Sequence, residues 1–253
     1  MSKVIVEQSG PVKTVWMNRP EKRNALDREM RQALTDALCA PVGADERVVV
    51  IRGKGGVFCS GLDMAERRAS AETGEASGIE VMLRAIELCP LPVVAVVHGD
   101  AIAGGNEMAL HCDLVVASEA ARFGMSLAQV GLAPNWFLSK KLMEVLGPVV
   151  TREMLLLGDP LPAGRLHALG LIARCVPAER LEAEAASVIE RLAANAPLSL
   201  RAMKATTVRM LEFRDTIPHE DVDALVRTAI SSEDAREGML ARLEKRAARF
   251  QGR

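Results

Sequence analysis

The stretch "AVVHGDAIAGGNEMALHCDLVVA", residues Ala95–Ala117, decides the fold. It opens on a β-branched run, passes through a loop with a glycine pair, continues in a largely apolar segment after Glu107, and closes on a second β-branched run. Such runs, alternating with helical segments, are typical of parallel strands joined by crossover helices. Because ligand sites in these sheets lie where strands end and helices begin, the loop ahead of Glu107 is a candidate site.

The chain on the N-terminal side of this stretch continues the alternation. The runs "VIVEQ" and "VKTVWMN" predict a hairpin of strands, and "RVVVIRG" predicts a buried strand. Between them, apolar residues recur at helical spacing at Met30, Ala33, Leu34, Ala37 and Leu38. The sequence therefore predicts an α/β fold.

The chain on the C-terminal side is almost wholly helical from Leu138, with only "LIARCVP" indicating a strand. We find no Pro/Gly/Ser-rich linker and no fixed-period repeat, so one domain with a helical C-terminal extension fits best. The last segment carries an apolar stripe that suits either packing within the chain or a contact between subunits. The stripe consists of Met239, Leu240, Leu243, Ala247 and Phe250.

Composition excludes several classes of protein. The chain has 253 residues, a net charge of -1 and 3% aromatic residues, which gives no basic stripe or ring platform for nucleic acid. The apolar run Leu91–Val97 is far shorter than the roughly 20 residues of a membrane span. The start of the chain resembles no secretory or transit signal, and its five scattered cysteines suggest reduced thiols. We expect a cytoplasmic protein without nucleic-acid or membrane partners.

Two glycine-bearing loops follow predicted strands. They are "RGKGGVFCSGLDM", residues Arg52–Met64, and "HGDAIAGGNE", residues His98–Glu107. Neither fits the phosphate-binding pattern G-x-x-x-x-G-K-[ST]. Glycine allows close approach of a ligand, and a helix start adds partial positive charge. The two loops together can therefore donate two backbone N–H groups to one oxygen, as an oxyanion hole does.

Two other kinds of site receive little support from the residues. Cys59 and Ser60 suggest a nucleophile, but no histidine stands near them and G-x-S-x-G is missing, which favours a structural role. His111, Cys112 and Asp113 suggest metal ligands. Adjacent helical residues point in different directions, and no second ligand pair follows, so we expect no metal.

Five motifs in order resemble the enoyl-CoA hydratase/isomerase, or crotonase, superfamily, and the resemblance covers nearly the whole chain. It implies an α/β, crotonase-like spiral of β-β-α units over residues 1–195 and a C-terminal helical trimerisation region over residues 196–253. It also implies a homotrimer or dimer of trimers that processes an acyl-CoA thioester, with no cofactor because coenzyme A is part of the substrate. The motifs are "NRPEKRNAL" (18–26), "RGKGGVFCSGLD" (52–63), "AVVHGDAIAGGNEMALHCDLVVA" (95–117), "ARFGM" (121–125) and "LEKRAARF" (243–250).

The resemblance implies roles for individual residues. The N–H groups of Leu62 and Gly104 would form the oxyanion hole, and Glu107 would stand where the family's hydratases place one of two catalytic glutamates. An acid in a first helical turn also suits the helix dipole, so Glu107 has a structural reading as well. The expected substrate-binding residues are Lys22, Arg23, Ser60, Gly61, Leu62, Asp63, Gly104 and Leu127.

The second glutamate of the family's hydratases is Leu127 in this chain. Hydration of a 2-enoyl thioester uses a base for water and an acid for Cα, and leucine supplies neither. Family isomerases often use one carboxylate, but it usually occupies the position that is leucine here. Nearby groups that can compensate are Asp63, Ser126, Gln129 and Asn135. Asp63 can equally cap the next helix.

Coenzyme A and the acyl chain receive further expectations from the resemblance. Arg19, Lys22 and Arg23 would meet the nucleotide phosphates, although a solvated turn explains these charges equally well. Lys245 would reach a neighbouring subunit's nucleotide. We expect residues between Met64 and Ile79 to line the acyl pocket, and Trp136 and Phe137 to narrow it near the reacting carbons.

The sequence favours an enoyl-CoA hydratase that converts a 2-enoyl-CoA into a 3-hydroxyacyl-CoA. Enoyl-CoA double-bond isomerisation is the alternative within the enzyme class, because one carboxylate suffices for it in principle. A CoA-ester-binding protein without hydratase activity is the alternative outside that class, because of Leu127. The sequence leaves open the length of the acyl chain, the pathway and the choice between trimer and hexamer.

Overall fold

The structure is a computed structural model that describes residues 2–73 and 77–253. A six-stranded sheet with the order β1-β2-β3-β4-β6-β9 forms its centre. The first two strands pair antiparallel, as the predicted hairpin requires, and the other neighbours pair parallel. The strands are β1 (Val4–Ser9), β2 (Val12–Met17), β3 (Val48–Gly53), β4 (Val93–Val97), β6 (Leu114–Ser118) and β9 (Arg174–Val176). The predicted α/β class is confirmed.

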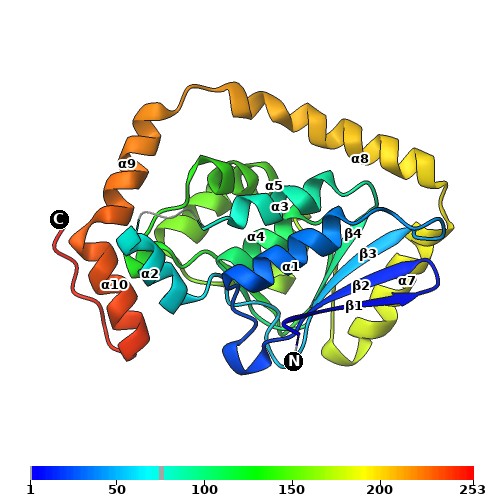
Figure 1. Cartoon of the computed structure of the whole chain (residues 1–253), viewed down its shortest axis with the longest axis horizontal. Coiled ribbons are helices and arrows are strands. Elements are labelled where there is room, and N and C mark those ends of the chain that lie inside the picture. The colour runs from blue at the N-terminus through cyan, green and yellow to red at the C-terminus, as the bar shows by residue number, and fades with distance from the viewer. Residues whose placement is uncertain (1, 74–76) are drawn as a thin grey trace.

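The central strands are buried on both faces, which explains their unbroken β-branched runs. Alternate residues of β3 enter two different apolar clusters, since successive side chains of a strand point to opposite faces. Val49 and Ile51 join the main core beneath α1 (Arg28–Cys39) and α3 (Ile79–Leu88), while Val48 and Val50 meet α7 (Leu181–Ala194). Helices therefore cover the sheet on both sides (Figure 1).

A second, smaller sheet has three strands. It has the order β5-β7-β8 and consists of β5 (Ala101–Ile102), β7 (Arg122–Gly124) and β8 (Leu161–Pro162). Parallel pairing of β5 with β7 fixes the loop that runs into α4 (Gly104–His111). The remaining elements of this part of the chain are η1 (Pro20–Lys22), α2 (Met64–Thr73), η2 (Ala128–Val130), α5 (Trp136–Leu156), α6 (Ala163–Ala168) and η3 (Ala178–Arg180).

The C-terminal helices wrap around one side of the molecule. They are α8 (Pro197–Leu211), η4 (Glu212–Thr216), α9 (Glu220–Ser231) and α10 (Glu233–Glu244). Figure 1 shows α8 extending along the outside, α9 turning back, and α10 lying beside α2. The predicted division between residues 195 and 196 lies just ahead of α8 and stays a prediction.

Contacts between α10 and η2 fix the position of this last helix. A Cβ at Gly238 would lie 2.4 Å from the carbonyl carbon of Val130, so only glycine permits the approach.

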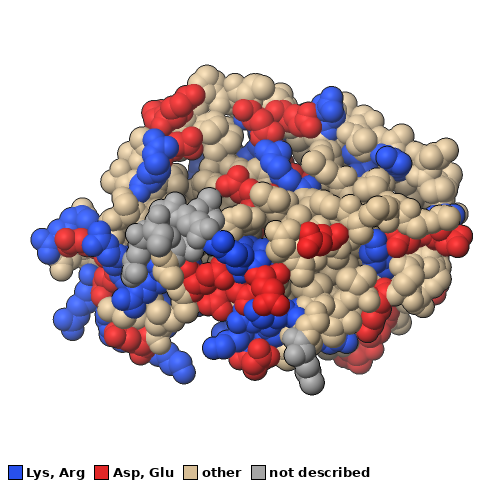
Figure 2. Space-filling view, viewed as in Figure 1, with Lys and Arg blue, Asp and Glu red and all other residues tan. Residues whose placement is uncertain are grey.

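No helix within the described residues is long and apolar enough to span a bilayer. On the face drawn in Figure 2, Lys and Arg side chains are interspersed with Asp and Glu.

Candidate active site

A cavity of about 180 Å³ lies where the two glycine loops meet. The loop after β3 contributes Ser60 and Leu62, and the loop after β5 contributes Ala103 and Gly104. Leu127, from the start of η2, closes another part of the wall. The structure therefore brings four of the sequence-predicted site residues to one cavity: Ser60, Leu62, Gly104 and Leu127.

Gly61 is the point at which the two loops touch. Its φ is +89°, and a Cβ there would lie 3.0 Å from the nitrogen of Gly104. Two backbone hydrogen bonds to Leu26 fix this loop. The Leu26 N–H donates to the Gly61 carbonyl, and the Leu26 carbonyl accepts from the Asp63 N–H. In such a parallel bridge the N–H of Leu62 points away from Leu26, toward the opposite side of the loop.

Both amides are available to a ligand. Among the described residues, none accepts a hydrogen bond from the N–H of Leu62 or of Gly104. Gly104 is the first residue of α4, where a helix leaves its N–H groups without intrahelical partners. Two free donors on converging loops are the arrangement that binds a developing oxyanion.

Ala103 is strained where it turns the chain into α4. Its φ of 50° and ψ of -116° lie in a region that residues with a side chain rarely adopt. The N–H of Ala103 donates to the Gly124 carbonyl at 2.7 Å, and its own carbonyl accepts from the Glu107 N–H at 3.0 Å. These contacts stabilise the strained backbone of the turn. Backbone strain of this kind is common at functional sites.

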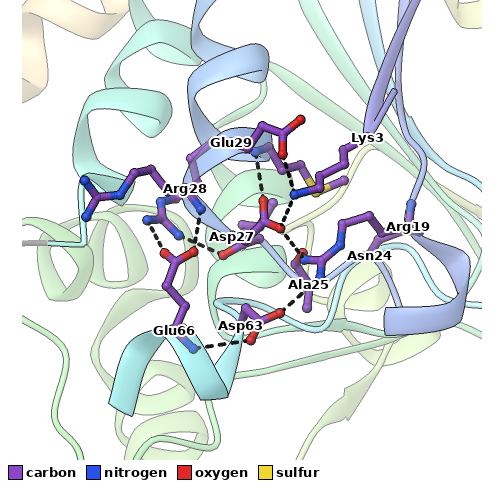
Figure 3. Close-up of polar contacts among 12 residues, drawn as sticks. Lys3, Arg19, Asn24, Ala25, Asp27, Arg28, Glu29, Asp63 and Glu66 are labelled. Atoms are coloured by element: carbon purple, nitrogen blue, oxygen red, sulfur yellow. Dashed lines mark hydrogen bonds and ion pairs between the residues drawn. The ribbon is translucent and has the colours of Figure 1, made fainter. Parts of the chain in front are cut away.

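A network of charged groups holds the Leu62 loop against the start of α1 (Figure 3). Arg19 donates to the Ala25 carbonyl at 2.7 Å and pairs with Asp27 at 3.0 Å and with Asp63 at 3.2 Å. Asp63 in turn accepts from the N–H of Ala65 at 3.1 Å and caps α2. Asp63 and Arg19 therefore act as structural groups, and neither lines the cavity.

Glu107 is fully buried, and the structure does not bring it to the cavity wall. Both carboxyl oxygens are without a hydrogen bond among the described residues, and Oε2 lies 3.6 Å from His111 Nδ1. Burial raises the pKa of Glu107 well above its ordinary value, an effect that Lys141 partly offsets. Its surroundings therefore favour the protonated form of Glu107, which lies one helical turn after the Gly104 amide.

Charged groups of α3 and α5 surround the opposite side of this buried acid. His111 donates from Nδ1 to the Glu107 carbonyl at 2.7 Å, because a carbonyl oxygen can only accept, and its Nε2 lies 3.9 Å from Glu87. Lys141 pairs with Glu87. Burial lowers the pKa of His111 well below its usual value, and Lys141 adds to this effect.

The groups that we considered as substitutes for the second glutamate separate into two sets. Ser126 and Asn135 line the cavity beside Leu127. Asn135 also caps α5 and donates to Glu80 at 2.5 Å. Gln129 lies outside the cavity and donates to the Leu157 carbonyl and to Asp159. Among the described residues, no Asp or Glu lines the cavity.

The other sequence-predicted residues lie outside the cavity. Lys22, in η1, is exposed, and Arg23 is 60% exposed and 3.8 Å from Asp100. Lys245 ends α10 in the left-handed conformation and is exposed. Of the four side chains that we expected at the nucleotide, these three are open to solvent, whereas Arg19 is paired with Asp27 and Asp63.

The structure bears on two further expectations, one about aromatic residues at the pocket and one about Cys59 as a nucleophile. Trp136 and Phe137 were wrong as pocket-narrowing residues, because Trp136 stacks on His219 and Phe137 stacks on His111. Burial raises the pKa of the Cys59 thiol to about 12, which keeps it protonated and agrees with a structural role.

Of the stretch Met64–Ile79, which we expected to line the acyl pocket, Met64, Arg67, Ser77 and Ile79 line the cavity. Residues 74–76 of that prediction lie outside the described residues. Sequence reasoning missed Arg242 and Ile230, which reach the same cavity from α10 and α9. No motif marks them, and their place depends on how the C-terminal helices fold back.

Comparison with known proteins gives consistent results. A family model described as enoyl-CoA hydratase/isomerase matches residues 7–253. A putative enoyl-CoA hydratase from Thermus thermophilus is 34% identical, over 96% of this chain and 98% of the relative. An enoyl-CoA hydratase structure from Mycobacterium avium subsp. paratuberculosis superposes with a TM-score of 0.84 at 31% identity, over 98% of each chain.

A second solved structure is of a different enzyme. Methylmalonyl-CoA decarboxylase complexed with 2S-carboxypropyl CoA superposes with a TM-score of 0.88 at 25% identity, over 100% of this chain and 99% of that one. The fold expected from the five motifs is thereby confirmed.

Proposed function

The chain belongs to the enoyl-CoA hydratase/isomerase family, and from that premise we propose that it is a 2-enoyl-CoA hydratase that forms 3-hydroxyacyl-CoA thioesters. The observation that carries the proposal is the convergence of the Leu62 and Gly104 amides on one cavity. Relatives named enoyl-CoA hydratase support the same reaction. The coenzyme A enters as part of the substrate.

Hydration joins a water oxygen to Cβ and moves an electron pair onto the thioester oxygen. The two N–H groups stabilise that negative charge, and such a donor typically contributes about 3–4 kcal/mol. The attacking water releases one proton as its oxygen bonds to Cβ, and the enolate returns to a thioester when Cα takes one proton, so that OH and H are added across the double bond. Glu107 lies in the first turn of α4, the helix that begins at Gly104, and its burial favours the protonated form from which a proton can be given.

Gly61→Ala tests the oxyanion hole directly. A Cβ at this residue would lie 3.0 Å from the Gly104 nitrogen and 2.9 Å from the Ala103 Cβ, which pushes the two amides apart. We expect kcat/KM for crotonyl-CoA hydration to fall about 10²- to 10³-fold, as on loss of one oxyanion donor. Loss of the conjugated absorbance of crotonyl-CoA measures the rate.

Gly56→Ala is the matched control, because a Cβ there meets nothing within 4 Å. Native rates in Gly61→Ala protein with an unchanged unfolding transition would refute the proposed hole. A 3-enoyl-CoA that gains conjugated absorbance without water uptake would indicate isomerase activity. Tight binding of acyl-CoA without any turnover would indicate a binding protein.

Decarboxylation of a carboxyacyl-CoA is the second candidate. The observation that favours it is that, among the described residues, no Asp or Glu lines the cavity, and that Leu127 takes part in the wall. Loss of CO₂ leaves an enolate directly, so the step needs the two amides but no base beside the substrate. Release of CO₂ from methylmalonyl-CoA, with crotonyl-CoA left unchanged, would favour this reaction.

We also propose that the chain assembles as a homotrimer or a dimer of trimers. Support comes from large apolar side chains of α8 and η4 that one chain leaves in solvent, since exposed apolar surface of this kind marks association sites. Leu198, Met203, Met210 and Phe213 are each more than half exposed, at 79%, 63%, 70% and 58%.

A further inference from the structure

Two arginines line the candidate cavity. Arg67 projects from α2, one helical turn after Met64, and Arg242 projects from the last turn of α10. Packing of α10 against α2 and η2 brings these two elements together although about 175 residues separate the two arginines. Both guanidiniums therefore share the cavity that holds the Leu62 and Gly104 amides.

Neither arginine has a charge partner in the part of the chain that the structure describes. Most other buried or half-buried cations of the fold are paired, as Arg19 is with Asp27 and Lys204 with Asp113. No Asp or Glu of the described residues lines this cavity. Burial lowers the pKa of Arg67, which is the expected effect on a cation without a counter-charge.

Much of the remaining wall is apolar, although Ser60, Ser77, Ser126 and Asn135 also take part in it. The apolar part consists of Met64, Ile79, Val130, Leu132, Leu138 and Ile230. Methylene groups suit this wall, whereas the phosphates of a nucleotide would lose their hydration there. The cavity, at about 180 Å³, is also smaller than the roughly 300–1,000 Å³ of drug-sized pockets, so it fits a short acyl chain.

We propose that Arg67 and Arg242 bind a carboxylate at the end of the acyl chain remote from the thioester, so that the preferred substrates are CoA esters of short dicarboxylic acids. This inference rests on the proposed function of the same cavity as an acyl-CoA site. A guanidinium pairs with a carboxylate through two parallel N–H donors, and such charge-assisted hydrogen bonds are stronger than neutral ones.

The test compares two substrates that differ only at the chain end. They are hex-2-enoyl-CoA and the analogue whose terminal methyl group is replaced by a carboxylate. We expect the native protein to prefer the carboxylated substrate by about 10-fold or more in kcat/KM. Arg67→Met should lower kcat/KM for the carboxylated substrate about 10- to 100-fold, mainly through KM, and change the uncharged one less than about 3-fold.

Arg242→Met should act in the same direction with a smaller effect, because this side chain is more exposed than Arg67. Arg67→Lys keeps the charge and should retain part of the preference. Arg68→Met is the matched control, since Arg68 lies on the same helix but does not line the cavity. We expect the control to leave both rates unchanged.

Two results would overturn the proposal. An equal loss with both substrates in Arg67→Met protein would show that Arg67 binds the coenzyme A phosphates. Native protein without preference for the carboxylated substrate would show that the arginines bind no acyl group.

A binding measurement separates this inference from the proposed reaction. Calorimetry with hexanoyl-CoA and adipoyl-CoA reports affinity without turnover. An Arg67-dependent preference for adipoyl-CoA in a protein that hydrates neither enoyl substrate would uphold the carboxylate site and reject the hydratase. Hydration of both enoyl substrates, together with equal affinity for hexanoyl-CoA and adipoyl-CoA, would uphold the hydratase and reject the carboxylate site.

Discussion

Glu107 occupies an environment that few acidic residues tolerate. It has no exposed surface, its carboxyl oxygens lack hydrogen-bond partners among the described residues, and the titratable groups near it are His111, Glu87 and Lys141. An unpartnered buried carboxylate costs free energy, so the protein favours the neutral acid. Retaining such a residue makes sense if its proton is used, as general acid catalysis requires.

Glu107→Gln separates the catalytic role from the structural one. An amide has the shape of the neutral acid but holds no transferable proton, so we expect hydration of crotonyl-CoA to fall about 10²- to 10⁴-fold. The pKa of Glu107 in the folded protein is above its value of 4.5 in the unfolded chain. Folding therefore favours the bound proton, and the stability of the native protein falls as pH rises from about 4.5 toward the folded pKa.

The glutamine variant lacks this loss of stability. The difference in free energy of unfolding, variant minus native, should increase from pH 5 to pH 8 when measured by urea denaturation. His111, whose pKa is lowered, contributes the opposite slope, but it is present in both proteins. A difference that stays flat with pH would mean that Glu107 is ionised in the fold, and unchanged turnover would exclude it from catalysis.

At the level of elements, the Leu62 loop is fixed by α1 rather than by its own residues. Arg19 joins Asp27, at the start of α1, to Asp63, at the start of α2. Arg28 and Arg31 of α1 reach Glu66 of α2, the latter through its side chain at 2.7 Å. The same helix therefore holds both ends of the segment that carries one oxyanion donor.

Arg19→Met should loosen this junction. Removing one partner leaves two carboxylates, each less than one-fifth exposed, without their shared cation, and we expect the free energy of unfolding to fall by about 1–3 kcal/mol. The Leu62 amide should also lose its fixed position, which lowers kcat for crotonyl-CoA about 10-fold. Urea denaturation and steady-state kinetics measure the two effects.

Arg122→Met is the comparison for this variant. Arg122 is 56% exposed and pairs with Asp100 at 3.1 Å, so its ion pair is screened by water. We expect a free energy of unfolding and a kcat close to those of the native protein. If the two variants behave alike, the Arg19 junction contributes no more than a surface ion pair.

For the molecule as a whole, the sequence predicted the central parts better than the periphery. The alternation of β-branched runs and helical segments identifies the sheet, because β3 and β4 are buried on both faces. The glycine loops predicted two converging backbone donors, and the family resemblance assigned them to Leu62 and Gly104. In the structure, Gly61 occupies a position where a Cβ would lie 3.0 Å from the Gly104 nitrogen. Local patterns suffice where local backbone geometry makes the site.

The missed residues depend on contacts between distant segments. Arg242 reaches the cavity because α10 folds back onto η2, where Gly238 meets Val130, and no local pattern records that contact. Trp136 and Phe137 were assigned to the pocket by position in the chain, but their rings turn to His219 and His111. Side-chain direction is set by packing, which spacing alone does not give.

The C-terminal helices also determine the last prediction, which concerns assembly. Met203 and Met210 are seven residues apart on α8 and therefore share one face, and both stand in solvent in the single chain. Met210→Asp places a charge on that face, and burial of an unpaired charge opposes association. We expect sedimentation velocity to show a trimer or hexamer for the native protein and smaller species for the variant. Leu169→Asp, at an equally apolar and half-exposed residue outside these helices, should leave the assembly intact, and a native protein that sediments as a monomer would refute the prediction.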